Sequence, residues 1–131
     1  MRWPFRRRAA PVVAYEDDGT LPVLLEARDP AVADSAVLAG HDLDAPVLVR
    51  HLLTGLPDDA AVERARELLG QDGYRLTVLE GPPYDVRAWR TQVLTPMAAS
   101  QERSRMAGLA QRLGGDVHGY DVCRPDPSPQ D

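Results

Sequence analysis

The stretch Val47–Leu53 (Val-Leu-Val-Arg-His-Leu-Leu) constrains the fold more than any other part of the sequence. It is the longest run of β-forming apolar residues, and it is bounded by Pro46 on one side and by Gly55-Leu56-Pro57 on the other. A run of this length that is apolar on both alternations is typical of a strand covered on both faces. We therefore expect the domain to be built around this strand.

The residues after this strand predict two helices and three further strands. Asp58 and Asp59 suit the first turn of a helix, and Thr95-Pro96 combines a hydroxyl N-cap with proline at the first helical position. The predicted elements are a helix from Pro57 to Gly70 or Gly73, strands Tyr74–Glu80 and Tyr84–Leu94, a helix from Thr95 to Gly114-Gly115, and a strand Asp116–Val122. The order β-α-β-β-α-β predicts an α+β, ferredoxin-like fold, with an antiparallel sheet in the order 4-1-3-2 and both helices on one face.

Residues before Pro46 predict a hairpin and a short helix. Residues 11–15 and 20–25 are β-prone, and the Asp18-Gly19 step between them favours a tight turn. Asp29-Pro30 then reads as the N-cap and first residue of a helix ending near Gly40. Helices on one face would leave the other face of the central strand bare, so we expect this N-terminal unit to cover it, or else a second protomer.

These patterns divide the chain into four parts. Residues 1–10 are predicted to be a flexible basic N-terminus, residues 11–45 the hairpin and helix, residues 46–122 the ferredoxin-like domain, and residues 123–131 a disordered, proline-rich tail.

The charge of the chain limits its possible binding partners, and its cysteine content indicates the cellular compartment. The 131 residues carry 15 basic and 20 acidic side chains; four of the basic ones are Arg2, Arg6, Arg7 and Arg8, which leaves 11 against 20 from residue 9 onward. An acidic body argues against nucleic-acid binding through charge. A single cysteine fits a reducing cytoplasm, and no apolar stretch approaches 18 residues, so we expect a cytoplasmic protein without a membrane contact.

Signatures of catalysis, metal binding and cofactor binding are missing from the sequence. His41, His51 and His118 are isolated from other ligands, Cys123 has no evident base beside it, and no phosphate-binding loop occurs. An RNA-recognition motif would place aromatic residues on both central strands, whereas here Trp89 stands alone. We therefore predict a non-enzyme with no metal, no cofactor and no direct contact with nucleic acid.

Three stretches resemble the ribonuclease E inhibitor B (RraB-like) family. Leu38-Ala-Gly-His-Asp-Leu-Asp-Ala-Pro46, followed by the strand containing His51, is similar to the family's acidic loop and histidine-bearing strand. Leu69–Val78 is similar to its helix followed by Gly-Tyr-x-Val, and Leu109–Val122 resembles its C-terminal pattern, with Tyr120 where the family favours tryptophan. The likeness spans roughly residues 36–122.

The resemblance implies a ferredoxin-like protein that binds a ribonuclease E/G-type endonuclease and damps RNA decay without catalysis. It carries no firm binding motif, so the contact residues are our own prediction: His51, Trp89, Tyr120 and Asp121, at the polar ends of the central and last strands. For Trp89 and Tyr120 the alternative is ordinary packing in the core. The alternative functions for the whole chain are a ferredoxin-like small-ligand sensor, an uncharacterised binding module, and an enzyme with catalytic groups from separate segments. The sequence leaves the oligomeric state open between a monomer and a homodimer.

Overall fold

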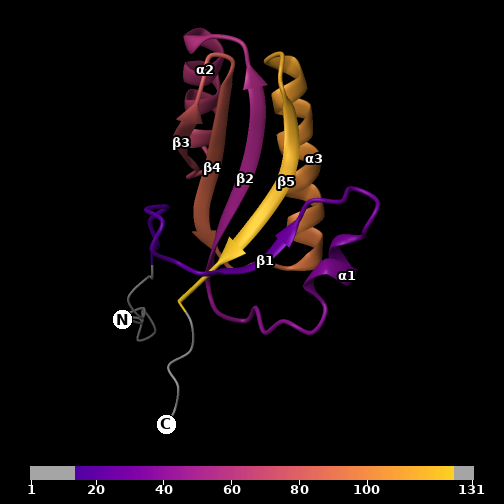
Figure 1. Ribbon diagram of the computed structural model, residues 1–131. Helices are drawn as coiled ribbons and strands as arrows, with labels where there is room; N and C mark the ends of the chain where they lie inside the picture. The colour runs from indigo at the N-terminus through magenta and orange to yellow at the C-terminus, as the bar shows by residue number, and fades with distance from the viewer. Residues whose placement is uncertain (1–13, 126–131) are drawn as a thin grey trace, which may run out of the picture.

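The computed structural model describes residues 14–125, which form one five-stranded sheet and three helices (Figure 1). The elements in chain order are β1 Val23–Ala27, α1 Asp34–Leu38, β2 Val47–Leu56, α2 Asp59–Gly70, β3 Arg75–Glu80, β4 Tyr84–Gln92, α3 Pro96–Arg112 and β5 Asp116–Cys123. The chain is therefore an α+β protein. None of the helices within residues 14–125 is long and apolar enough to cross a membrane.

The sheet is antiparallel throughout, with the strand order β1-β5-β2-β4-β3. This corrects the predicted four-stranded sheet in the order 4-1-3-2, because β1 pairs with β5 and adds a fifth strand at that edge. Strand β2 lies in the middle, between β5 and β4, and Arg50 faces Asp121 on one neighbour and Trp89 on the other.

The apolar side chains on both faces of β2 explain its central place in the sheet. Val47, Val49 and Leu53 are fully buried against the helices, and Leu48 is buried on the second face of the sheet. Burial of β-branched and leucine side chains on both faces is what a central strand provides.

Helix α3 begins where the sequence predicts, with Thr95 as its N-cap, while α2 begins at Asp59, two residues after the predicted Pro57, with Asp58 as its N-cap. The Asp58 side chain accepts a hydrogen bond from the Ala61 N–H at 2.9 Å, and the Thr95 hydroxyl accepts one from the Ala98 N–H at 3.1 Å. Each cap satisfies an N–H group that has no partner within its helix. Figure 1 shows α2 and α3 together on one side of the sheet.

Two apolar clusters lie between the sheet and the helices. The first packs α2 and the C-terminal half of α3 on β2 and β4, and it includes Leu53, Leu69, Val86 and Met106. The second lies at the other end of the helix layer, where α1 and the first turns of α3 meet β1, β2 and β5. Helix α1 thus extends the helix layer instead of covering the second face.

The predicted N-terminal hairpin is wrong. Its second arm, β1, pairs with the distant β5, while Ala14 and Tyr15 belong to no strand and residues 11–13 lie outside the described residues. Asp18 does make a local turn, since its carboxylate accepts bonds from Thr20, but the turn does not bring two strands together. Helix α1 starts at Asp34 and not at the predicted Pro30, because the Asp29 carboxylate accepts a hydrogen bond from the Ala31 N–H in a separate turn.

The second face of the sheet is covered by residues 14–22, which we call the covering segment. Tyr15 and Leu21 of this segment pack on a buried cluster of Leu48, Trp89 and Cys123. The expectation that N-terminal residues cover this face is therefore met by an extended segment, neither by a hairpin nor by α1. Cys123, predicted to begin a disordered tail, instead ends β5 and is fully buried; residues 1–10 and 126–131 lie outside the described residues.

Candidate protein-binding surface

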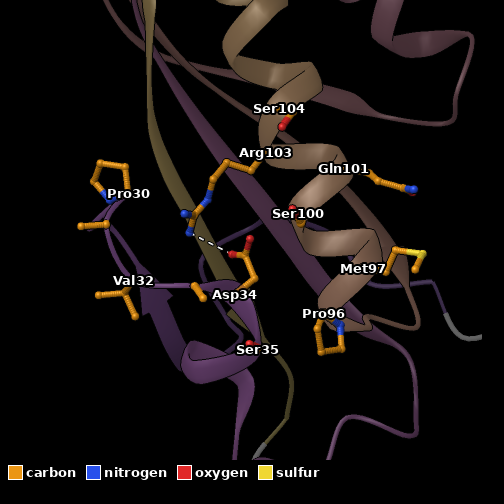
Figure 2. A pocket seen from close by; sticks show the side chains of 12 residues that line it. Pro30, Val32, Asp34, Ser35, Pro96, Met97, Ser100, Gln101, Arg103 and Ser104 are labelled. Atoms are coloured by element: carbon orange, nitrogen blue, oxygen red, sulfur yellow. Dashed lines mark ion pairs between the residues drawn. The ribbon is translucent and has the colours of Figure 1, made fainter.

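A groove of about 600 Å³ separates the loop before α1 from the first three turns of α3. Figure 2 shows the loop side chains on one side and the α3 side chains on the other. The lining residues are Pro30, Ala31, Val32, Ala33, Asp34, Ser35, Pro96, Met97, Ser100, Gln101, Arg103 and Ser104. A lining that mixes apolar groups, uncharged polar groups and one pair of opposite charges suits contact with another molecule.

An ion pair forms the floor of this groove. Arg103 extends from α3 toward Asp34 of α1, and the two groups lie 2.9 Å apart (Figure 2). Asp34 is nearly buried, and the Arg103 side chain is four-fifths covered. Among the described residues, two buried nitrogens of the guanidinium, Nε and Nη2, find no hydrogen bond of good geometry, so the pair is held by charge more than by directed bonds.

The rim of the groove exposes large apolar side chains. Met97 is 70% exposed and Val32 is 39% exposed. Val93, which is 50% exposed, lines an adjoining hollow of about 290 Å³ that shares Ser35 and Pro96 with the groove. Apolar side chains that gather beside a polar-floored groove are typical of an interaction site, while single exposed ones are ordinary.

A buried hydrogen-bonded network supports the floor from inside. The Tyr120 hydroxyl donates to Asp34 at 2.8 Å, and the guanidinium of Arg103 lies 5.5 Å from the centre of the Tyr120 ring. The ring of His51 lies 5.6 Å from that of Tyr120, and its Nε2 lies 3.3 Å from Glu102 of α3. These contacts fix α1, α3, β2 and β5 relative to one another.

Glu102 joins the network to β4. Its carboxylate accepts hydrogen bonds from Gln92 at 2.6 Å and from Arg90 at 3.1 Å. Burial alone would raise the pKa of Glu102, but hydrogen bonds from His51 and Gln92 outweigh it and hold the pKa at about 2. The carboxylate is thus ionised at neutral pH, and its partners make a buried charge tolerable.

The four predicted contact residues do not share a surface. His51 and Tyr120 lie on the helix face and are essentially inaccessible, at 1% and 0% exposure. Trp89 and Asp121 lie on the second face and are 7% and 6% exposed. The predicted surface at the polar ends of these strands is therefore divided between the two faces of the sheet. For Tyr120 and Trp89 the burial agrees with the packing alternative, and a role in binding stays a prediction.

The isolated histidines and the cysteine also have definite places. His41 lines the hollow beside the groove together with Asp44, while His118 lines another hollow with Arg103. Cys123 is a buried thiol whose pKa is raised by burial. Within residues 14–125, no group of three His, Cys, Asp or Glu side chains is arranged to hold a metal ion.

None of the side chains that line the groove was predicted to form a site. Met97 carries the clearest signal that was available, because it lies off the buried stripe of α3 formed by Met106, Leu109 and Ala110. A large apolar residue on the outward side of an amphipathic helix has no place in the core. Val32 and Asp34 gave no such signal, since their contact with α3 depends on the tertiary fold.

A family model described as RraB, regulator of ribonuclease activity B, matches residues 26–122, well over half of the chain. Every residue that lines the groove lies within the matched range, whereas the covering segment precedes it. Neither a curated protein nor a solved structure gives a significant match.

Proposed function

The chain belongs to the RraB family of regulators of ribonuclease activity, and from this premise we propose that it binds an RNase E-type endonuclease and damps its cleavage of RNA. The proposed action is stoichiometric and non-catalytic: the protein occupies a surface of the nuclease and does not modify it. The partner follows from the family, while the surface and the physical basis of the contact come from this chain.

The groove between the loop before α1 and α3 is the surface we propose for this contact. The single observation that carries this choice is the exposed Met97 beside the Arg103–Asp34 pair, within the matched part of the chain. A flexible methionine adapts to an irregular partner surface.

Long-range charge would guide the encounter. With 20 acidic and 15 basic residues, four of the latter before residue 9, the folded body is acidic. An RNA-cleaving enzyme needs basic surface for its substrate, so the two proteins would attract one another. Association is then expected to slow as salt rises, while dissociation depends on the groove.

The test is direct binding of an RNase E-type endonuclease to the purified protein and to two matched variants. Met97→Asp puts a charge in the groove, and Val78→Asp makes the same kind of change at a 43% exposed position on β3, the edge strand farthest from α1. We expect Met97→Asp to weaken binding at least tenfold and Val78→Asp to leave it within twofold. Equal effects would remove the groove from the proposal, and no binding by the unmodified protein would remove the nuclease.

A small-ligand sensor is the second candidate, and the size of the groove favours it. A volume of about 600 Å³ falls within the range of ligand pockets, which is roughly 300–1,000 Å³. A thermal-shift screen with amino acids and nucleotides separates the two functions. A shift that Met97→Asp abolishes would support the sensor, and no shift with any compound would dismiss it.

We also propose that the protein is ferredoxin-like and acts in the cytoplasm. The order β5-β2-β4-β3 of the last four strands supports the first proposal, with β1 as an addition at the edge. The cytoplasmic location follows from the proposed partner. Whether the protein forms a homodimer is tested by its mass in solution.

A further inference from the structure

The covering segment, residues 14–22, lies on the second face of the sheet without joining it as a strand. Its backbone is tied to the rest of the described chain by the Tyr15 N–H, which donates to the Thr91 hydroxyl at 2.8 Å, and by the Pro22 carbonyl, which accepts from the Arg124 N–H at 3.2 Å. Side chains make its other contacts with the sheet. A segment held in this way resembles a bound peptide more than a strand of the domain.

Asp17 is the anchor of this segment. Its side chain is fully buried, and its carboxylate lies between two arginines of the central strands: Arg50 of β2 at 3.1 Å and Arg87 of β4 at 2.8 Å. Charge-assisted bonds of this kind are among the strongest polar contacts in proteins. Arg50 also pairs with Asp121 at 2.7 Å, so it keeps a partner without Asp17; for Arg87, the carboxylate partner found among the described residues is Asp17.

Two further contacts flank the anchor. Glu16 pairs with Arg75 of β3 at 3.2 Å, and the guanidinium of Arg75 lies 5.6 Å from the centre of the Trp89 ring. Tyr15 packs on the apolar cluster that contains Trp89. The segment therefore presents an aromatic ring and two successive carboxylates to a tryptophan and three arginines.

We propose that this arginine face, consisting of Arg50, Arg75, Arg87 and Trp89, is a binding site for an extended acidic peptide of a partner protein. The peptide would carry an aromatic residue followed by two carboxylates, as the covering segment does at positions 15–17. The covering segment then acts as an internal competitor that occupies the site until the partner's peptide displaces it. This proposal does not depend on the nuclease or on the groove, and its test uses neither.

Single-stranded RNA is the other ligand that arginines and an aromatic ring on a sheet would suit. The observations favour the peptide for two reasons. The occupant seated on the face is itself a peptide that contributes carboxylates, and the acidic body of the protein repels a phosphate backbone. RNA binding is accordingly an outcome of the test that would overturn the proposal.

The test uses the full-length protein and a synthetic peptide with the sequence of residues 14–22, labelled with a fluorophore. A tethered competitor acts at a high effective concentration, so the unmodified protein should bind the free peptide weakly. Asp17→Asn removes the anchoring charge of the covering segment and leaves the face intact. Asp18→Asn is the matched control, because Asp18 is exposed and bonds Thr20 within the segment.

We expect Asp17→Asn to bind the peptide at least tenfold more tightly than the unmodified protein or Asp18→Asn. A peptide that itself carries Asp17→Asn should lose this affinity, and salt should weaken the binding. Binding of the two variants with equal affinity would overturn the proposal, as would tighter binding of a uridine oligoribonucleotide than of the peptide by Asp17→Asn.

Cys123 supplies a second readout, because it is the single cysteine of the chain and lies buried beneath the covering segment. Its modification by a thiol reagent should be at least tenfold faster in Asp17→Asn than in Asp18→Asn, and added peptide should slow it again. Equal rates would show that the segment does not open and would overturn the proposal. If Asp17→Asn does not fold, Tyr15→Ala, which removes the aromatic contact, takes its place with the same expected results.

Discussion

Replacing Glu102 with glutamine tests the buried network that supports the groove. Glu102 is 9% exposed, and its carboxylate accepts hydrogen bonds from Arg90 and Gln92, with His51 Nε2 3.3 Å away. A glutamate whose pKa falls from its usual 4.5 to about 2 on folding contributes about 3 kcal/mol to stability at neutral pH. The sign follows from the direction of the shift. Since folding lowers the pKa, the contribution is complete above pH 4.5 and is lost as the pH falls toward 2.

Urea denaturation at several pH values measures this contribution. We expect Glu102→Gln to lower the free energy of unfolding by about 3 kcal/mol at pH 7 and by about 1 kcal/mol at pH 3. Glu63→Gln is the control, because Glu63 is 68% exposed and its pair with Arg66 at 3.4 Å is worth little. A loss at pH 7 equal to that of the control, or one that does not shrink with acid, would refute this account of the network.

Four further substitutions test three separate features. Tyr120→Phe should lower the free energy of unfolding by about 2 kcal/mol, because it removes a buried hydrogen bond to the side chain of Asp34, and an unchanged urea midpoint would contradict this. Gly119→Ala should prevent stable folding, because the backbone angle φ is +91° and an added Cβ would clash with the backbone of β1. Gly108→Ala, in the open interior of α3, should instead raise the thermal midpoint by a few degrees. Melting curves measure both effects, and a Gly119→Ala variant more stable than Gly108→Ala would contradict the fold. Thr95→Ala should lower the free energy of unfolding by about 1 kcal/mol, because it removes the N-cap of α3. A loss smaller than that caused by a Thr→Ala change at an exposed position in the middle of a helix would count against the cap.

Local patterns predicted the elements from residue 47 onward well, because each depends on neighbours in sequence. The strand at Val47–Leu53 could be predicted from its apolar residues on both faces alone, and the start of α3 could be predicted from Thr95-Pro96 alone. The N-terminal hairpin failed for the opposite reason. The partner of β1 is β5, nearly a hundred residues later, and the turn at Asp18 could not reveal that.

The candidate site was less predictable, since its parts come together only through tertiary packing. His51 and Tyr120 were predicted as binding residues, which stays a prediction, and their partners on α3 and α1 are remote in sequence: Asp34 lies 86 positions from Tyr120, and Glu102 lies 51 from His51. Burial of both residues followed from those partners. The exposed Met97 is the one feature of the groove that helical periodicity could have indicated.

The most direct test of the proposed regulation is the rate at which an RNase E-type endonuclease cleaves a labelled RNA in the presence of this protein. We predict that the unmodified protein and Val78→Asp slow cleavage equally, and that Met97→Asp needs at least tenfold more protein for the same effect. A cleavage rate that stays constant at a protein concentration well above that of the nuclease would contradict the proposed regulation.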